Sequence, residues 1–407
     1  MSIARGDAVA LARELVRVDS RNPSLVAGAP GEAAVARVLA DILSTWGFEV
    51  DVHAAGEGRP NVLAWIPGDA GLIVSESIDP AAEFRPEMPA LMFNGHLDVV
   101  GVDGMVHAPF DAETRDGRMY GRGSTDMKGG VAAMCAAAVR AADAGVTRDI
   151  LIAAVADEEF ESLGTNELLR RGVRARAAIV TEPTKLAIAP AHRGFAWVEV
   201  VVTGRAAHGS RYDVGVDAIR HAGLLLAELD LFDEQELVRR THPLLGHASL
   251  HASLISGGIG MSTYPDRCVL HLERRTVPGE RVESVIAEVE QACARVRARR
   301  PTFEAEVIRR FSQNPSDVAV DAPIVRSLAA ALAEEGMPAP MEGLSAWTDA
   351  ALLNEAGIPA ICFGPGDIAL AHAAEEWVSE AEIERATDAL TRLAGNWCKS
   401  GESAWRS

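Results

Sequence analysis

Apolar runs of strand length alternate with apolar positions at helical spacing over most of the chain. The apolar positions between residues 35 and 46 recur every three or four residues, which predicts one buried helix face, and Gly47 ends this helix. Repeated alternation of this kind predicts an α/β fold with a mostly parallel sheet covered by helices. Predicted strands lie at 48–54, 61–68, 90–100, 150–156, 177–183 and 358–364, further helices at 128–144 and from residues 165, 323 and 379, and a proline- and acid-rich surface loop at 68–88.

The pattern changes between residues 191 and 311. Two longer amphipathic strands are predicted there, at 195–204 and 268–277, with two helices at 216–229 and 281–299. Two strands and two helices in this span predict a smaller α+β domain. Because the first pattern returns after residue 311, we expect residues 1–190 and 312–407 to form one α/β domain into which residues 191–311 are inserted.

Composition excludes several classes of protein. The chain has 407 residues, of which 48% are hydrophobic, and a formal net charge of -19, which argues against nucleic acid or an anionic membrane surface as a partner. No apolar run approaches the ~18 residues of a membrane span. Five scattered cysteines without a C-x-x-C pair suit reduced thiols, and charged residues within the first 14 positions oppose a secretory signal. We therefore expect a cytoplasmic protein.

Four carboxylates follow directly on the predicted strand at 150–156. They are Asp157, Glu158, Glu159 and Glu161. Like charges so close together repel one another and shift each other's pKa unless something positive holds them. This stretch alone is compatible with a solvated acidic loop or with a cation site.

Other polar residues also lie at strand ends or in the loops after them. His96 and Asp98 are two apart and so share one face of a strand, Asp126 lies in a glycine-rich turn, Glu182 ends a strand, and His372 follows the last strand. Ligands of an open α/β sheet gather outside the carboxyl ends of its strands, so we expect these side chains to meet. A carboxylate such as that of Asp98 can accept the second N–H of a neighbouring imidazole and thereby orient it.

Such a set of side chains predicts a metal centre. Imidazole and carboxylate ligands without thiolate suit zinc, with manganese or cobalt as alternatives. Five ligands, one of them a bridging carboxylate, would hold two ions about 3.5–4 Å apart.

Seven motifs in order along the chain resemble the M20 metallopeptidase family, the group of acetylornithine deacetylase and succinyl-diaminopimelate desuccinylase. The motifs are "GHLDVV", "GRGSTDMKGG", "DEE", "TEPT", "AAHGS", "RTVPGE" and the "GPG…AH" tail. The resemblance implies a zinc-peptidase-like catalytic domain with an inserted lid and dimerisation domain. It also implies that Asp126 bridges two zinc ions and precedes a cis peptide, with His96 and Glu182 completing one site and Glu159 and His372 the other.

The resemblance further assigns catalytic and substrate-binding roles. Glu158 is similar to the family's general base, which would activate a metal-bridging water for attack on an amide. His208 corresponds to a histidine that reaches the oxyanion from the partner subunit of a homodimer. Arg193 and Arg275 match positions that bind substrate carboxylates, whereas Arg274 is expected to be a surface charge.

Differences between this sequence and branches of the family indicate which substrates are expected. Ala346 and Trp347 replace the Gly-Thr pair in which desuccinylases resemble one another. The next three residues, Thr348, Asp349 and Ala350, look closer to the acetylornithine deacetylase branch. We therefore favour a deacylase of N-acyl amino acids. A dipeptidase or carboxypeptidase acting on a short peptide is the alternative, followed by a non-catalytic binding protein on the same fold.

Overall fold

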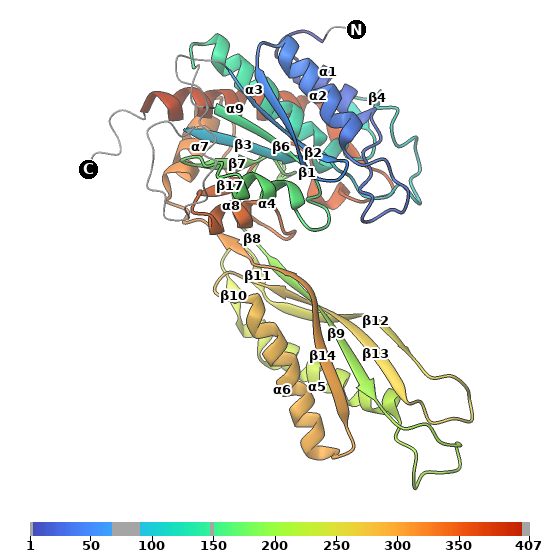
Figure 1. Cartoon of the computed structure of the whole chain (residues 1–407). Coiled ribbons are helices and arrows are strands. Elements are labelled where there is room, and N and C mark those ends of the chain that lie inside the picture. The colour runs from blue at the N-terminus through green and yellow to red at the C-terminus, as the bar shows by residue number, and fades with distance from the viewer. Residues whose placement is uncertain (1–2, 67–89, 147–149, 401–407) are drawn as a thin grey trace. The chain divides into compact units, whose positions relative to one another are not determined.

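The computed structural model describes residues 3–66, 90–146 and 150–400, and its chain divides into two compact units (Figure 1). The first unit comprises the described parts of residues 1–190, 318–342 and 348–407, and the second comprises residues 191–317 and 343–347. The surface loop predicted at 68–88 falls outside the described residues.

The sheet of the first unit is parallel at its centre, which confirms the predicted fold class. Strands β6 (Ile150–Val155), β3 (Leu91–His96), β7 (Ala178–Val180) and β17 (Ala360–Cys362) are parallel neighbours in this order, and every residue in them is buried. Burial on both faces explains why their sequences read as continuous apolar runs rather than alternating ones. The flanking strands β1 (Glu49–Gly56) and β2 (Arg59–Trp65) belong to the first unit, and the short strands β8 (Ile188–His192), β15 (Ser316–Asp317) and β16 (Met341–Leu344) lie where the chain passes from one unit to the other.

Helices pack against this sheet and against one another. Helix α3 contacts α1 and α9, α9 contacts α7, and α2 and α4 contact the strands β1 and β2. The helices of the first unit are α1 (Ala8–Val16), α2 (Ala33–Thr45), α3 (Gly129–Asp143), α4 (Leu163–Arg170), α7 (Pro323–Glu334), α8 (Ala350–Glu355) and α9 (Glu380–Ser400). Short elements are β4 (Glu113–Arg115), β5 (Arg118–Tyr120), β18 (Trp377–Ser379) and the single turns η1 (Ser124–Lys128) and η3 (Ile368–Leu370).

One glycine sets how closely α3 approaches the sheet. A Cβ atom on Gly130 would lie 2.0 Å from the carbonyl oxygen of Thr181, far inside van der Waals contact. Only glycine therefore allows the first turn of α3 to lie against the chain that leaves β7. This contact brings the turn before α3 close to the end of β7.

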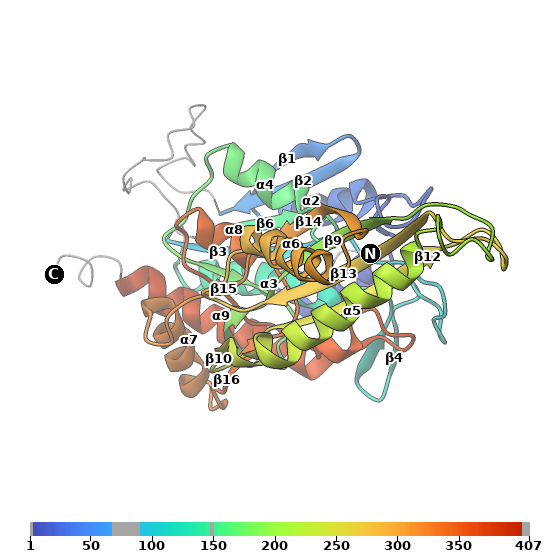
Figure 2. The same ribbon diagram turned by 90° about the horizontal axis from the view of Figure 1, so that it is seen from below.

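The second unit is a four-stranded antiparallel sheet with two helices on one face. Helices α5 (Ala218–Gln235) and α6 (Val282–Arg299) lie side by side over the sheet (Figure 2) and bury one side of it. The sheet has the order β12 (Ser249–Gly257), β13 (Arg267–Thr276), β9 (Gly194–Thr203), β14 (Glu304–Gln313), and the remaining short elements are η2 (Leu237–Arg239), β10 (Thr241–His242) and β11 (Gly246–His247).

Two of these four strands were not predicted. Most of β12 is exposed, and β14 carries charged residues on much of its length, so neither shows the alternation that identified β9 and β13. Both lie at the edges of the sheet, where only one neighbour and little burial constrain the sequence. The expectation that Arg274 is a surface charge was wrong. Its side chain is only 1% exposed and pairs with Glu280.

The described residues bear on two expectations from the sequence, the state of the cysteines and the lack of a membrane-spanning helix. Cys135, Cys268, Cys293 and Cys362 are buried free thiols, as expected for reduced cysteines. Among the helices of the described ranges, none has the length and apolarity needed to cross a membrane.

Candidate metal centre

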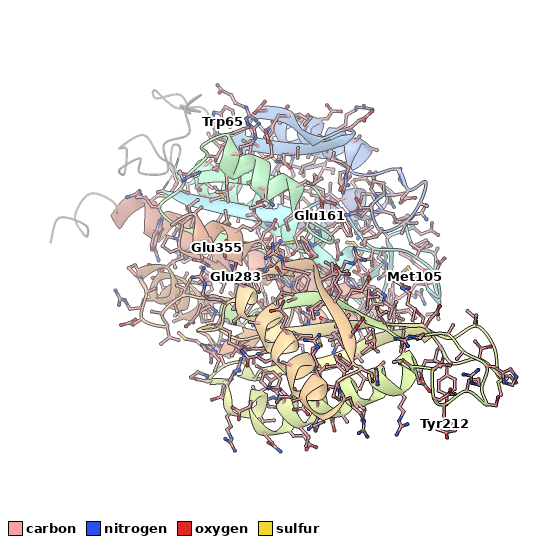
Figure 3. The ribbon with its side chains drawn as sticks, turned by 60° about the horizontal axis from the view of Figure 1, so that its bottom comes forward. Trp65, Met105, Glu161, Tyr212, Glu283 and Glu355 are labelled. Atoms are coloured by element: carbon pink, nitrogen blue, oxygen red, sulfur yellow. The ribbon has the colours of Figure 1, made fainter. Side chains whose placement is uncertain are left out.

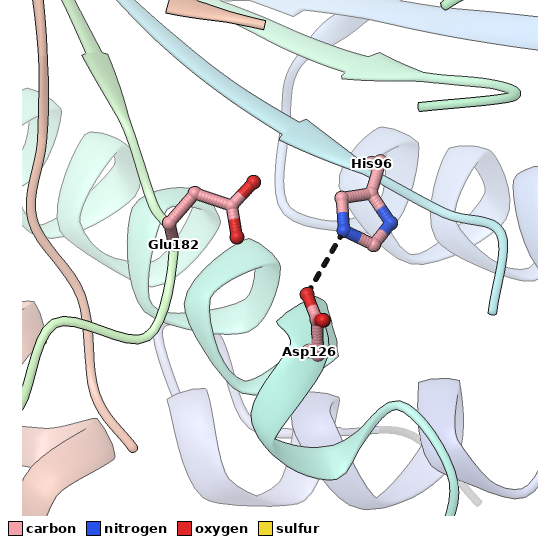
Figure 4. A group of neighbouring side chains, drawn as sticks. All are labelled: His96, Asp126 and Glu182. Carbon is pink, nitrogen blue, oxygen red and sulfur yellow. Dashed lines mark hydrogen bonds and ion pairs between the residues drawn. The ribbon is translucent and has the colours of Figure 1, made fainter. Parts of the chain in front are cut away.

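Two groups of potential metal ligands meet at the carboxyl ends of the parallel strands. The first group is His96, Asp126 and Glu182 (Figure 4), and the second is Asp126, Glu159 and His372. Within each group, one ligand atom from every residue lies within 4.8 Å of the others. Asp126 belongs to both groups, so a single carboxylate joins them.

The strand order explains why residues so distant in sequence meet here. His96 is the last residue of β3, Glu159 follows β6, Glu182 follows β7, and His372 lies in the loop after β17. These four strands are parallel neighbours, so their carboxyl ends share one edge of the sheet. Asp126 reaches the same edge from the turn η1, which the close approach of α3 holds beside β7.

Distances within the groups fit bound cations. Nε2 of His96 is 3.1 Å from Oδ1 of Asp126, and Nε2 of His372 is 3.0 Å from Oε2 of Glu159 and 3.4 Å from Oδ2 of Asp126. Two ligands about 2.1 Å from one tetrahedral ion would themselves be about 3.4 Å apart. The donor atoms are therefore already at the spacing that a shared ion requires.

The electrostatics of the carboxylates also fit cations. Burial raises the pKa of Glu182 well above its usual value, and the charge of Asp126 adds to this effect. Burial likewise raises the pKa of Glu158, helped by Glu182, and that of Glu159, helped by Asp126. Buried carboxylates that cannot all ionise on their own are stabilised when divalent cations lie among them.

The two imidazoles supply positive charge around Asp126. Burial opposes a charged His96, but hydrogen bonding to Asp126 raises its pKa well above the usual value. For His372, hydrogen bonds to Asp126 and Glu159 outweigh partial burial and raise the pKa to about 11. Burial would raise the pKa of Asp126, yet its hydrogen bonds with both imidazoles hold it well below its usual value. Cations between these atoms would supply the same positive charge with both rings neutral.

Glu158 lies beside the two groups but belongs to neither. Its Oε2 is 3.9 Å from Nε2 of His96, and its side chain is 10% exposed. Glu158 is thus close enough to act on a molecule held at the centre, while its carboxylate remains outside both ligand groups.

Asp98 supports the centre in a different way from the one predicted. Nδ1 of His96 is 2.9 Å from the backbone carbonyl of Asp98, whereas the Asp98 carboxylate is 3.7 Å away. That carboxylate instead accepts the backbone N–H groups of Glu158 at 3.1 Å and Glu159 at 3.2 Å. Asp98 therefore orients His96 through its main chain and holds the turn of the two glutamates through its side chain.

A buried network behind this turn was not predicted. Asp157 is fully buried and accepts hydrogen bonds from Asn22 at 2.9 Å and from Arg59 at 2.8 Å. Arg59 also forms an ion pair with the buried Glu32. The sequence gives no signal for this network, because Asn22, Glu32 and Arg59 are distant from the motifs and typical of surface residues.

Two residues of this region have an uncommon backbone conformation. Asp157 and His372 have φ angles of 67° and 60°, in the left-handed region that residues other than glycine rarely adopt. The conformation is not confined to this region, since it is shared by Ala112, Asp116, Ser162, Lys185 and Leu186. The cis peptide that the family resemblance predicts at Asp126–Met127 is present.

The other three predicted residues lie in the second unit. His208 is exposed in the loop after β9, where its Nδ1 is 2.8 Å from Oγ of Ser210, and the same loop exposes Tyr212 (Figure 3). Arg193 donates to the backbone carbonyl of Leu245, and among the described residues no carboxylate lies within ion-pair distance of it. Burial lowers the pKa of Arg193, and the positive charge of Arg275 lowers it further.

An aromatic cluster beside Arg275 was not predicted. The ring of Phe195 lies 5.1 Å from that of Trp197, 5.8 Å from that of Phe311 and 6.4 Å from that of Trp347. The guanidinium carbon of Arg275 is 5.4 Å from the Phe195 ring, and Trp197 remains 40% exposed. The guanidinium group of Arg275, which also forms an ion pair with Glu273, therefore lies beside apolar rings of the second unit.

Known proteins resemble this chain over most of its length. Residues 92–396 match the model of peptidase family M20/M25/M40. An acetylornithine deacetylase from Myxococcus xanthus is 32% identical over 317 residues, which cover 76% of this chain and 80% of that protein. An N-formyl-4-amino-5-aminomethyl-2-methylpyrimidine deformylase from Bacillus subtilis is 27% identical over 395 residues and 88% of each protein. The fold alone is similar to that of an M20 family metallo-carboxypeptidase from Sulfolobus solfataricus, with a TM-score of 0.78 and 16% identity over 97% of this chain and 99% of that one.

Proposed function

This chain belongs to peptidase family M20/M25/M40 and is a metal-dependent hydrolase of amide bonds, and we propose that it removes the acyl group from an N-acyl amino acid. The observation that carries the proposal is the shared carboxylate of Asp126 between two ligand groups, with Glu158 beside them. The relatives named a deacetylase and a deformylase support removal of an acyl group. A dipeptidase or carboxypeptidase is the second candidate, because such an enzyme also hydrolyses an amide beside a carboxylate.

We assign two divalent ions to the two ligand groups. His96, Asp126 and Glu182 would hold one ion, and Asp126, Glu159 and His372 would hold the other. Imidazole and carboxylate donors without thiolate favour zinc, with cobalt or manganese as alternatives. When bound, such a pair of ions lowers the pKa of a water molecule and polarises the scissile carbonyl.

Glu158 is assigned as the general base. Its carboxylate is close to the ligands and is needed by neither group, so it is available to accept a proton from the attacking water. Burial raises its pKa, which makes the carboxylate a stronger acceptor of the water's proton before that proton passes to the leaving nitrogen. Asp98 holds the backbone of Glu158 in place for both transfers.

Arg193 and Arg275 are assigned to the substrate carboxylate. Arg193 has donors to spare, and a planar guanidinium group binds a carboxylate through two parallel hydrogen bonds. The aromatic cluster beside Arg275 favours an apolar or aromatic group elsewhere in the substrate.

A panel of amides tests this substrate class. We expect hydrolysis of N-acyl amino acids, fastest for those with an apolar or aromatic group, and little hydrolysis of the same compounds with the carboxylate converted to an amide. Arg193→Gln should raise KM by roughly 10–100-fold with little change in kcat, because a charge-assisted hydrogen bond is worth about 1.5–3 kcal/mol. Faster turnover of dipeptides than of every N-acyl amino acid would instead favour the peptidase.

We further propose a cytoplasmic homodimer that forms through the second unit. Its edge strand β12 exposes Leu254 (65%) and Ile255 (56%), and an exposed apolar edge strand is a template for pairing with another chain. His208 is exposed on the same unit and is assigned to the oxyanion of the partner subunit's substrate.

Subunit mixing tests the role of His208. His208→Ala and Glu158→Ala homodimers should each be nearly inactive, because an oxyanion donor is worth about 3–4 kcal/mol and the base cannot be replaced. A heterodimer of the two variants should regain activity, since one of its sites then has both groups intact. Verified heterodimers that stay inactive would mean that His208 serves its own subunit or has no catalytic role.

A further inference from the structure

Glu376 is a buried carboxylate that belongs to neither ligand group. It lies four residues after His372, at the end of the same loop, and its side chain is fully buried. A buried carboxylate requires partners, because an isolated charge in a protein interior is strongly destabilising.

The partners of Glu376 lie in the turn that carries Asp126. Its Oε1 accepts the backbone N–H groups of Thr125 at 3.1 Å and Asp126 at 3.2 Å. Its Oε2 is 2.7 Å from a guanidinium nitrogen of Arg122, which is 3% exposed and also donates to the carbonyl of Gly101 at 3.0 Å. The carboxylate is therefore bonded on both sides, to the main chain of the shared ligand and to a fixed cation.

Further hydrogen bonds hold the loop around Glu376. The hydroxyl of Thr125 donates to the carbonyl of Trp377 at 2.5 Å, and the backbone N–H of Gly121 donates to the carbonyl of Glu376 at 3.2 Å. The N–H of Val106 donates to the carbonyl of Ala374 at 3.0 Å. The bonds of Thr125 and Gly121 tie the loop that carries His372 to the turn that carries Asp126 and the residues just before it, and the bond of Val106 holds the same loop from a second segment.

We propose that Glu376, held by Arg122, is a positioning residue that fixes Asp126 and His372 relative to each other. The inference rests on the proposed function, since it takes these two residues as metal ligands. Asp126 is common to both groups, so a tilt of its peptide displaces a ligand from both ions. Stability alone is a weak reason for the Arg122–Glu376 pair, because apolar residues of similar volume often replace a buried ion pair without loss.

Zinc binding to the metal-free protein tests this role without an activity assay. Glu376→Gln keeps the shape of the side chain, but its NH2 group must face either Arg122 or the two backbone N–H groups, all of which are donors. We expect calorimetry to show 10–100-fold weaker binding of both zinc equivalents, the usual effect of losing an outer partner of a metal ligand. In the enzyme assay kcat should fall with KM nearly unchanged, and excess zinc should restore part of kcat.

Glu280→Gln is the matched control. Glu280 also accepts a backbone N–H, from Val277 at 2.9 Å, and pairs with the buried Arg274, but it lies in the second unit. This variant should melt at a lower temperature and bind zinc as the wild type does.

The outcomes separate this inference from the proposed function. If Glu376→Gln melts lower but keeps wild-type zinc affinity, Glu376 is merely structural and the inference is wrong. A wild-type protein that binds no zinc-like ion would overturn the proposed function instead. Should the glutamine variant fail to fold, Glu376→Asp keeps the charge but is too short to reach all its partners, and its zinc affinity should still fall below that of the control.

Discussion

Glu158→Gln is expected to slow hydrolysis by at least the ~10²–10⁴-fold typical of lost acid–base catalysis, with both ions still bound. Glutamine keeps the size of the side chain and one acceptor oxygen, but it cannot take a proton from water. The fold should hold, because Glu158 follows the end of β6 and its backbone N–H remains bonded to Asp98. The effect should appear in kcat with little change in KM, since substrate binding is not assigned to this residue.

The neighbouring substitution Glu159→Gln provides the comparison. Glu159 belongs to the second ligand group, so its variant should bind one ion more weakly and lose activity that excess metal partly restores. Metal content and turnover are to be measured on the same samples. Loss of metal from Glu158→Gln, or normal affinity for both ions in Glu159→Gln, would show that the two roles are wrongly assigned.

Removal of metal should abolish hydrolysis altogether. The purified protein is expected to contain up to two zinc-like ions per chain, and chelation should leave it inactive until zinc, cobalt or manganese is added back. The expected loss is the largest of all, because Glu158 alone cannot polarise the scissile carbonyl. Elemental analysis before chelation, after chelation and after re-metallation should follow activity, and a demonstrably metal-free protein with full activity would contradict the assignment.

The meeting of the five candidate ligand residues at one edge of the sheet could be predicted from the sequence for a specific physical reason. Parallel strands bring their carboxyl ends to one edge, so residues that follow β3, β6, β7 and β17 must lie near one another whatever the intervening chain does. The apolar runs that precede His96, Glu159 and Glu182 reveal those strands, because they are buried on both faces. Asp126 lies on no strand, and only its glycine-rich turn and the family resemblance indicate its place.

The supporting residues could not be predicted because their partners are set by tertiary packing. Arg59, Arg122 and Glu376 are charged residues of a type that usually faces solvent, yet each is buried against an opposite charge. No periodicity distinguishes them from surface residues, and their partners are far away in sequence. The contacts of the Asp98 carboxylate could not be predicted either, although Asp98 is close to His96 in sequence. They depend on where the turn after β6 lies rather than on the spacing from His96.

The contact between Gly130 and Thr181 has a consequence for how the centre tolerates change. Gly130 follows the turn of Asp126, and Thr181 immediately precedes Glu182. The contact between Gly130 and Thr181 therefore sets the distance between the two segments that carry these residues of the first group, and it involves main-chain atoms. Elsewhere a change in one side chain can be absorbed when its neighbour adopts another rotamer. No side chain lies between Gly130 and Thr181, so a change of rotamer cannot relieve a clash there. The distance between the segments that carry Asp126 and Glu182 is therefore fixed by the position of the backbone. Gly129 is confined in the same way, because a Cβ atom there would lie 2.7 Å from the carbonyl oxygen of Ser124, so both glycines that begin α3 are closed to every residue with a Cβ atom.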